Sequence, residues 1–411
     1  MSEADRFLVV AHSARLLVQS AARARHPVCA LDLFDDADTG RFALHSEAAQ
    51  PRAGEGAGFD RQDLLLRAAR LCPPSRCLGL VYGAGFEDDT ETLALLARGR
   101  ELLGNPPELV ARLKDPAEFF GLLDRLGIAH PPTVLARPER RRGWLFKRRG
   151  ATGGSHVVDA SLVDCDSAAR DGYFQRRAAG RNLSLLFLAN GRRAEVIGIS
   201  RQLTRGVGDR RYTYAGAVGP IGVPAAVSRT LRDALQALIE HTGLVGCNSV
   251  DFLLDDDRPA VLEINPRPSA TMDLYDADWP DGLFDAHLNA CRGRLPRGSR
   301  ASPARPVRAH GIVYARARLR IASNIGFPAW CSDIPRPGSD LAIDVPVCTV
   351  HAGGTDARAA LRQLSRRRRQ TELRLTGQPD SEETENECNH RAPERQSHRG
   401  SLGRVAAGTP Q

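Results

Sequence analysis

Residues 251–273 read DFLLDDDRPAVLEINPRPSATMD, and this stretch decides the fold. Two largely apolar runs flank the polar residues DDDR, a pattern typical of two antiparallel strands joined by a short turn. In such a hairpin Asp251 and Glu263 can lie side by side. Asn265 is two residues beyond Glu263, so both point to the same face of their strand. The stretch therefore predicts two carboxylates and an amide oxygen on one surface.

This set of oxygen atoms suits a hard cation. Mg²⁺ prefers oxygen ligands, keeps several waters and takes phosphates of a substrate as its remaining ligands. Asp251, Glu263 and Asn265 are therefore candidate metal ligands, and Mn²⁺ is an alternative metal. Arg267 points the same way if the strand persists. The alternative interpretation is that these polar residues line an ordinary hairpin.

Lysine is rare in this chain. Of 57 lysine and arginine residues only Lys114 and Lys147 are lysines. An arginine is a wide planar fork, whereas a lysine is a compact point charge that fits against phosphate oxygens in a narrow cleft. Lys147 is followed by a glycine loop (GATGG, 150–154), where small residues let backbone N–H groups approach a phosphate. The alternative for the lysines is that two survive by chance in an arginine-rich composition. The alternative for the glycine loop is an ordinary turn.

The order of these features resembles the ATP-grasp superfamily. Lys114 lies in a helical segment, Lys147 precedes a glycine loop, and Asp251 precedes the segment EINPRPSA. The segment 251–273 is the most specific part, together with LKDPAEFFGLLDRLGIAHPPT and LFKRRGATGGSHV. The resemblance covers about residues 105–290, and the preceding α/β unit is similar to the domain that usually comes before this fold.

The resemblance implies an enzyme that clamps ATP and activates a carboxylate as an acyl phosphate, which an amine then attacks. Lys147 and Arg267 are the catalytic candidates, the arginine stabilising the transferred phosphoryl group or the acyl phosphate. The implied nucleotide contacts are Lys114 and Lys147 at the phosphates, Gly153 and Gly154 in the mobile loop, Gln175 at the hinge and Asn182 at the ribose.

One position departs from the family pattern. Many members carry a glutamate after the hinge glycine, in the order G-x-E, to bind the ribose hydroxyls. This chain reads GRN at 180–182, so Asn182 stands there. An amide can still form a hydrogen bond with a hydroxyl, so the resemblance implies that Asn182 takes the place of this glutamate at the ribose.

We predict α/β and α+β architecture: a small N-terminal parallel-sheet domain, a two-subdomain ATP-grasp clamp and a small mostly-β C-terminal domain. The alternation of strands with helices between residues 6 and 86 carries the first part of this prediction. The expected units are 1–105 (α/β domain), 106–175 (subdomain with the glycine loop), 176–292 (subdomain with the metal site), 293–308 (linker), 309–370 (β-rich domain) and 371–411 (disordered tail).

The substrate is a further expectation. Several segments, among them VYGAGFEDD and RYTYAGAVGP, resemble ATP-grasp proteins found with archaeal-type one-carbon metabolism in methylotrophic bacteria, which are related to tyramine–glutamate ligases of methanofuran synthesis. The resemblance implies a ligase joining glutamate to tyramine or tyrosine, with another amino acid substrate as an alternative. Arg201, Arg211 and Tyr212 are candidate substrate contacts, and their alternative is a solvated loop.

Composition narrows the class of protein. No apolar run is long enough to span a bilayer and the first residues lack a signal-peptide layout, so we expect a cytoplasmic protein without a membrane partner. Nine scattered cysteines indicate reduced thiols. The formal charge of +8 comes largely from local arginine runs without interleaved aromatics, so we expect small-molecule substrates and no nucleic acid.

Three alternatives stay open at this point. A homodimer is one possible assembly. A regulatory or scaffold protein with a degenerate nucleotide site is a second interpretation of the whole chain, and nucleic-acid binding through the arginine runs is a third. We assign no role to the isolated residues His12, His156 and His310.

Overall fold

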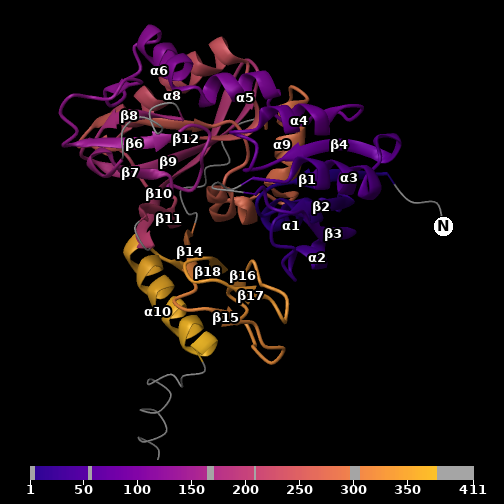
Figure 1. Ribbon diagram of the computed structural model, residues 1–411. Helices are drawn as coiled ribbons and strands as arrows, with labels where there is room; N and C mark the ends of the chain where they lie inside the picture. The colour runs from indigo at the N-terminus through magenta and orange to yellow at the C-terminus, as the bar shows by residue number, and fades with distance from the viewer. Residues whose placement is uncertain (1–4, 54–57, 164–170, 208–209, 297–305, 377–411) are drawn as a thin grey trace, which may run out of the picture.

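The computed structural model describes residues 5–53, 58–163, 171–207, 210–296 and 306–376. Its N-terminal sheet has four parallel strands in the order β3-β2-β1-β4 (Figure 1). Every residue of β1 and β2 is buried, as expected of strands covered by helices on both faces. The elements are β1 (Arg6–Val10), α1 (Arg15–Arg23), β2 (Val28–Asp32), α2 (Thr39–Phe42), β3 (His45–Ala48), α3 (Arg61–Leu71), β4 (Cys77–Tyr82) and α4 (Thr90–Ala97).

Two helices and a small sheet follow. Helix α5 (Pro107–Lys114) ends and α6 (Pro116–Arg125) begins at Asp115, whose carboxylate accepts hydrogen bonds from the N–H groups of Ala117 and Glu118. This cap explains why the chain breaks beside Pro116, which has no N–H to continue α5. The sheet order is β5-β8-β6-β7, with strands β5 (Thr133–Val134), β6 (Trp144–Arg148), β7 (Val157–Asp159) and β8 (Gly172–Arg176).

An eight-stranded antiparallel sheet forms the centre of the molecule. Its order is β13-β12-β9-β10-β11-β14-β18-β16. Alternate residues of β9 face different helices: Leu185 and Phe187 pack with α8, whereas Leu186 and Leu188 pack with α9 and the N-terminal sheet. The elements are β9 (Arg181–Asn190), β10 (Ala194–Val207), β11 (Arg210–Gly219), α8 (Ala225–Thr242), β12 (Val245–Asp255), β13 (Arg258–Asn265), η3 (Ala270–Leu274), α9 (Gly282–Cys291), β14 (Val307–Tyr314), β16 (Cys331–Ser332) and β18 (Pro346–Gly354).

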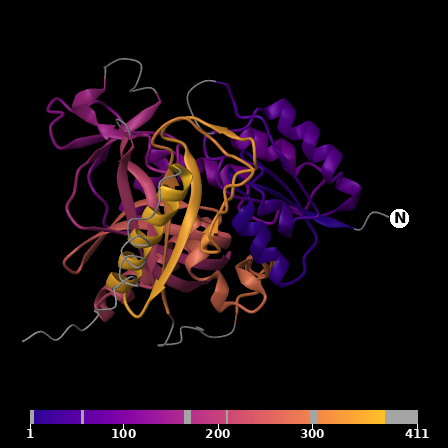
Figure 2. The same ribbon diagram turned by 90° about the horizontal axis from the view of Figure 1, so that it is seen from below.

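The C-terminal strands extend this large sheet. Strand β14 pairs with β11, and β18 pairs with β14, so the sheet runs on without a break (Figures 1 and 2). The small pair β15 (Leu319–Arg320) and β17 (Asp340–Leu341) lies beside it. The expected mixed α/β architecture with a small parallel sheet at its N-terminus is confirmed. The greater part of the predicted linker, residues 297–305, lies outside the described residues.

The predicted start of a disordered tail at residue 371 is wrong. Helix α10 (Ala357–Thr376) continues to Thr376. It does so because Thr371 is buried and Leu375 packs against the core cluster formed by β14 and β18. The rest of the predicted tail, residues 377–411, lies outside the described residues. In the described part of the chain no helix is long and apolar enough to cross a membrane.

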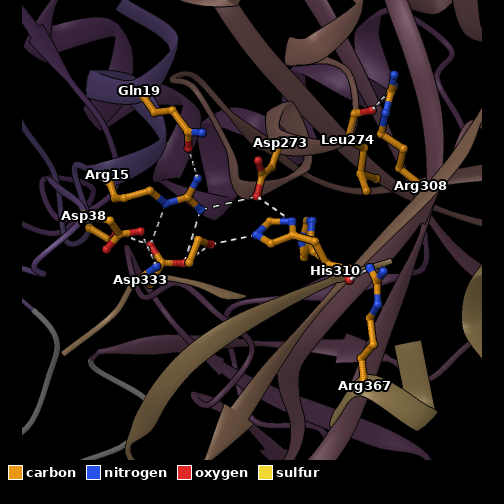
Figure 3. Close-up of polar contacts among 12 residues, drawn as sticks. Arg15, Gln19, Asp38, Asp273, Leu274, Arg308, His310, Asp333 and Arg367 are labelled. Atoms are coloured by element: carbon orange, nitrogen blue, oxygen red, sulfur yellow. Dashed lines mark hydrogen bonds and ion pairs between the residues drawn. The ribbon is translucent and has the colours of Figure 1, made fainter. Parts of the chain in front are cut away.

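A buried polar network joins the N-terminal domain to η3 and to the segment that follows β16 (Figure 3). Arg15, only 4% exposed, donates from Nε to Asp333 Oδ1 at 3.0 Å and from Nη2 to Asp273 Oδ2 at 3.3 Å. Asp38 accepts from the backbone N–H groups of Asp333 (2.9 Å) and Ile334 (2.8 Å). One guanidinium thus joins α1, η3 and the segment after β16.

Asp36 is an acidic residue close to the aspartates of this network. Burial, with the neighbouring Asp333, Asp32 and Asp38, raises the pKa of its carboxyl to about 8, although Arg15 opposes the shift. An acid whose pKa is higher in the folded state binds its proton more tightly there. Its ionisation therefore destabilises the fold as pH rises from about 4 to about 8.

We expect Asp36→Asn to stabilise the protein at alkaline pH. Below pH ~4 the variant and the parent should have similar melting temperatures, because Asp36 is protonated in both the folded and the unfolded parent. The difference should grow through pH 4–8 and then level off. Differential scanning calorimetry at several pH values measures it, and a constant difference at all pH values would contradict the assignment.

Candidate functional site

The predicted metal ligands lie together on one face of the large sheet. Strand pairing sets Asp251 of β12 opposite Glu263 of β13, and Asn265 Nδ2 donates to Asp251 Oδ2 at 3.3 Å. Asp251 and Asn265 are each 7% exposed, whereas the Glu263 side chain is 37% exposed and lines a small pocket. The alternation of the two strands thus produces the arrangement that the spacing predicts.

Both lysines reach this group of residues from different elements. Lys114, at the end of α5, donates from Nζ to Asn265 Oδ1 at 3.0 Å and lies 3.5 Å from Glu263 Oε2. Lys147, on β6, is 9% exposed and donates to Gln175 Oε1 at 2.7 Å. Glu263 interacts electrostatically with both lysines, so polar groups of α5, the small sheet and the β12–β13 hairpin meet in one place.

The charges in the site perturb one another. Burial, together with the adjacent Glu263, raises the pKa of Asp251 to about 6. Burial alone would also raise the pKa of Glu263, but Lys114 and Lys147 outweigh it and hold that pKa below its usual value. Burial lowers the pKa of Lys147. The site thus holds carboxylates whose charge the lysines only partly offset.

The donor set fits a divalent cation that brings its own ligands. Asp251 Oδ1 is buried and accepts no hydrogen bond from the described residues. Within that same part of the chain, no group of three or more His, Cys, Asp or Glu side chains could hold a metal ion. Two carboxylates and one amide therefore need further ligands, and water and phosphate oxygens are those that Mg²⁺ takes.

The glycine loop lies against β11. The carbonyl of Gly153 accepts a hydrogen bond from the N–H of Tyr214 at 2.8 Å. Gly153 and Gly154 both have φ of +72°, in the left-handed region that favours glycine. A side chain at Gly154 would overlap the carbonyl oxygen of Tyr212, whereas one at Gly153 would meet nothing within 4 Å.

Gln175 lies on the strand next to that of Lys147, and Asn182 lies on the strand next to that of Asp251. Gln175, on β8, is 2% exposed, and its Nε2 donates to Thr133 Oγ1 at 3.1 Å. Asn182, on β9, is two residues from Ser184, which pairs with Asp251, so alternation puts Asn182 on the face that carries the acidic residues. Its Oδ1 is buried without a hydrogen-bond partner in the described chain. A hydroxyl donor would suit this atom.

Arg267 contacts a residue that the sequence did not single out. Its Nε donates to Glu87 Oε1 at 2.6 Å, and both side chains are buried. Glu87 lies in the turn after β4, within the segment VYGAGFEDD. The available signal was its place beyond the carboxyl end of a parallel strand, where such sheets bind ligands.

The three predicted substrate contacts do not form one group. Arg201, on β10, pairs with Val218 of β11, whereas Arg211 lies near the opposite end of β11, where Val207 pairs with Arg210. At about 3.3 Å per residue this separates Arg201 from Arg211 by roughly 20 Å along the hairpin. Tyr212 lies beside the glycine loop. Arg201 and Arg211 therefore cannot bind one small substrate together.

Of the histidines left without a role, His310 is buried and His156 is half-buried. His156 follows the glycine loop and lines the same pocket as Glu263 and Lys114, and burial lowers its pKa to about 4. His310, on β14, shares a hydrogen bond of 2.8 Å between its Nε2 and the hydroxyl of Tyr214, and burial lowers its pKa to about 4 as well. Both rings are therefore neutral near pH 7.

Comparison with protein families agrees with this geometry. Residues 115–271, which hold Lys147, the glycine loop and all three candidate metal ligands, match the family described as ATP-grasp domain. This central part of the chain is thus similar to an ATP-grasp domain. The match begins one residue after Lys114 and ends before α9.

Individual relatives are distant. The carbamoyl phosphate synthase large chain of Halomonas eurihalina is 24% identical over 201 residues, which are 43% of this chain but only 18% of that protein. An uncharacterized protein of Methanocaldococcus jannaschii is 22% identical over 308 residues, covering 72% of this chain and 74% of that one. The chain thus spans less than a fifth of the length of the synthase.

Solved structures share the fold over most of the chain. The biotin carboxylase of Campylobacter jejuni gives a TM-score of 0.67 at 12% identity, covering 86% of this chain and 89% of that one. The N5-carboxyaminoimidazole synthetase of Staphylococcus aureus, complexed with ADP, gives 0.63 at 14% identity, covering 88% and 98%. The fold therefore extends beyond the ATP-grasp domain to the N-terminal sheet.

The two loop glycines offer a matched pair of variants. Gly153→Ala and Gly154→Ala both force alanine into the left-handed region, at a cost of roughly 1–2 kcal/mol. Only Gly154→Ala adds an overlap with β11. We expect Gly154→Ala to weaken ATP binding at least about tenfold more than Gly153→Ala, by isothermal titration calorimetry. Equal effects would show that the contact with Tyr212 is unimportant.

Proposed function

We propose that this protein is an ATP-dependent carboxylate–amine ligase that works through an acyl phosphate. The observation that carries the proposal is the meeting of both lysines of the chain with Asp251, Glu263 and Asn265. Lys114 directly precedes the residues that match the ATP-grasp domain, and the other four residues lie within them. Phosphoryl transfer needs positioned charge more than covalent chemistry from the protein. The similarity to a carbamoyl phosphate synthase and to a biotin carboxylase supports the same class.

The reaction would run in two steps. A carboxylate oxygen of the acid substrate attacks the γ-phosphorus of ATP, the bond to the β-phosphate oxygen breaks, and ADP leaves. The amine nitrogen then attacks the carbonyl carbon of the acyl phosphate, inorganic phosphate leaves, and the nitrogen releases a proton. The amide product therefore costs one ATP.

The residues have separate tasks in this proposal. Lys114 and Lys147 bind the phosphates and offset the charge of the triphosphate. Asp251, Glu263 and Asn265 would hold Mg²⁺, which neutralises phosphate charge when bound. Arg267 binds the transferred phosphoryl group. The glycine loop covers the phosphates and excludes water, which protects an acyl phosphate from hydrolysis.

We propose glutamate as the acid, and tyramine or tyrosine as the amine, within synthesis of a methanofuran-type cofactor. The resemblance of VYGAGFEDD and RYTYAGAVGP to ATP-grasp proteins of one-carbon metabolism supports this choice. The test is a mass-spectrometric screen of amino acids and aromatic amines with ATP, alongside measurement of ADP. Binding of Mg²⁺·ATP without turnover on any acid and amine would instead favour a regulatory or scaffold role.

Lys147→Arg should lose most turnover although it keeps the charge. The lysine is buried and its Nζ lies 2.7 Å from Gln175 Oε1, so a guanidinium has no room to replace it. We expect kcat/KM for ATP to fall about 100-fold or more. Steady-state kinetics measure this loss. Arg177→Lys, which exchanges the same two residue types at an exposed position, is the control. Activity near that of the parent would refute the phosphate role of Lys147.

Glu263→Gln should raise the Mg²⁺ concentration needed for half-maximal activity. The change removes one of two carboxylates while keeping the shape of the side chain, so the site loses negative charge but keeps its size. A titration of ADP release against Mg²⁺ at fixed ATP measures the shift. Glu240→Gln, at an exposed position of α8, is the matched control. An unchanged Mg²⁺ dependence would remove Glu263 from the metal site.

A further inference from the structure

The turn after β4 contacts Arg267 through a fully occupied carboxylate. Glu87 is 6% exposed, and its Oε1 accepts from Arg267 Nε at 2.6 Å. Its Oε2 accepts from the backbone N–H groups of Gly85 (2.7 Å) and Phe86 (3.0 Å). Both oxygens are therefore used, and the carboxylate is fixed to its own turn as well as to the arginine.

This pair leaves part of the guanidinium available. Besides Glu87, Arg267 donates only from Nη1 to the carbonyl of Pro268 at 3.1 Å among the contacts of the described residues. Burial would raise the pKa of Glu87, but Arg267 and Lys114 lower it to about 2, so the carboxylate stays ionised. A planar guanidinium held along one edge by a carboxylate can present its remaining N–H groups to an anion.

The N-terminal domain also holds the backbone beside Arg267. The hydroxyl of Tyr82, the last residue of β4, donates to the carbonyls of Asn105 (2.8 Å) and Pro266 (3.3 Å). Asn105 Nδ2 donates to the same carbonyl of Pro266 at 2.8 Å. The segment that carries Arg267 is thus fastened to the N-terminal domain at both its backbone and its side chain.

The same turn supports the glycine loop. Gly150 has φ of +64°, and a side chain there would lie 2.7 Å from the carbonyl oxygen of Glu87 and 2.6 Å from Cβ of Asp88. Only glycine allows so close an approach. One turn of the N-terminal domain therefore touches both the arginine of the candidate site and the start of the loop that covers it.

We propose that Glu87 is a positioning residue that couples the seating of the glycine loop at Gly150 to the orientation of Arg267. Among the described residues the hydrogen bonds of the Glu87 carboxylate go to Arg267 and to its own turn, so in this proposal it acts through Arg267. This inference rests on the proposed function for the role of Arg267. The contact between the loop and the turn stands independently of it.

The kinetic test is Glu87→Gln with Glu47→Gln as its control. Both variants remove a carboxylate charge from an arginine, but Glu47 pairs with Arg67 and Arg70 away from the site. We expect Glu87→Gln to lower kcat at least about tenfold while KM for ATP stays within about threefold, because Arg267 acts in the transition state. Glu47→Gln should change neither. A parental kcat, or equal losses in the two variants, would overturn the proposal.

Loop seating has a readout that needs no turnover. Trypsin can cut after Arg148 and Arg149, which precede Gly150, and ADP should slow this cleavage by seating the loop. We expect that protection to fall several-fold in Glu87→Gln and in Gly150→Ala, with circular dichroism spectra like the parent's. Full protection in both variants would overturn the coupling.

The two proposals can fail separately. Trapping with hydroxylamine tests whether the parent forms an acyl phosphate at all. If no acid yields a hydroxamate, the ligase proposal fails, and the trypsin experiment still decides whether Glu87 governs the loop. If hydroxamate forms equally fast in the parent and in Glu87→Gln, the ligase proposal stands and the positioning role is lost.

Discussion

The carboxylates of the buried Asp251 and the half-buried Glu263 lie side by side, and the rest of the site offsets the repulsion between them. Two like charges at neighbouring strand positions disfavour each other's ionisation, and burial makes the repulsion stronger. Cations must therefore be close. Lys114 and Lys147 supply part of this compensation, and they hold the pKa of Glu263 below its usual value while that of Asp251 remains raised. A site balanced in this way favours a further cation together with the anion that it carries.

The compensation comes from elements on different sides of the site. Lys114 ends α5, Lys147 belongs to the small sheet, and the acids belong to the large sheet. No single one of these elements carries both the acids and the lysines, so the charges offset one another only when all three elements are folded together. A site lined by several elements suits a ligand that a loop covers after it binds, because the glycine loop can close over a bound phosphate.

The sequence was sufficient for much of this site because strand alternation is a local rule. The spacing of Asp251, Glu263 and Asn265 predicted their shared face, and two lysines in an arginine-rich chain stood out by composition alone. Contacts between distant segments were beyond such rules. Glu87 lies 180 residues from Arg267, and nothing in its neighbourhood marks it as the partner of that arginine. The separation of Arg201 from Arg211 was likewise beyond such rules, since it depends on the register of β10 and β11.

The outer parts of the fold were predicted least well for a related reason. The helical pattern of α10 weakens after residue 368, yet Thr371 is buried and Leu375 packs with the core around β14 and β18, so tertiary contact extends the helix. Those strands in turn continue the large sheet, which brings Asp333 and the N-terminal Arg15 together. Arg15 also contacts Asp273, which follows Arg267 by only six residues in the chain. The segment between β13 and η3 is thus held by Glu87 and Tyr82 at one end and by Arg15 at the other. Both sets of contacts come from the N-terminal domain. That domain therefore fixes the position of Arg267, although the lysines and the candidate metal ligands belong to later parts of the chain.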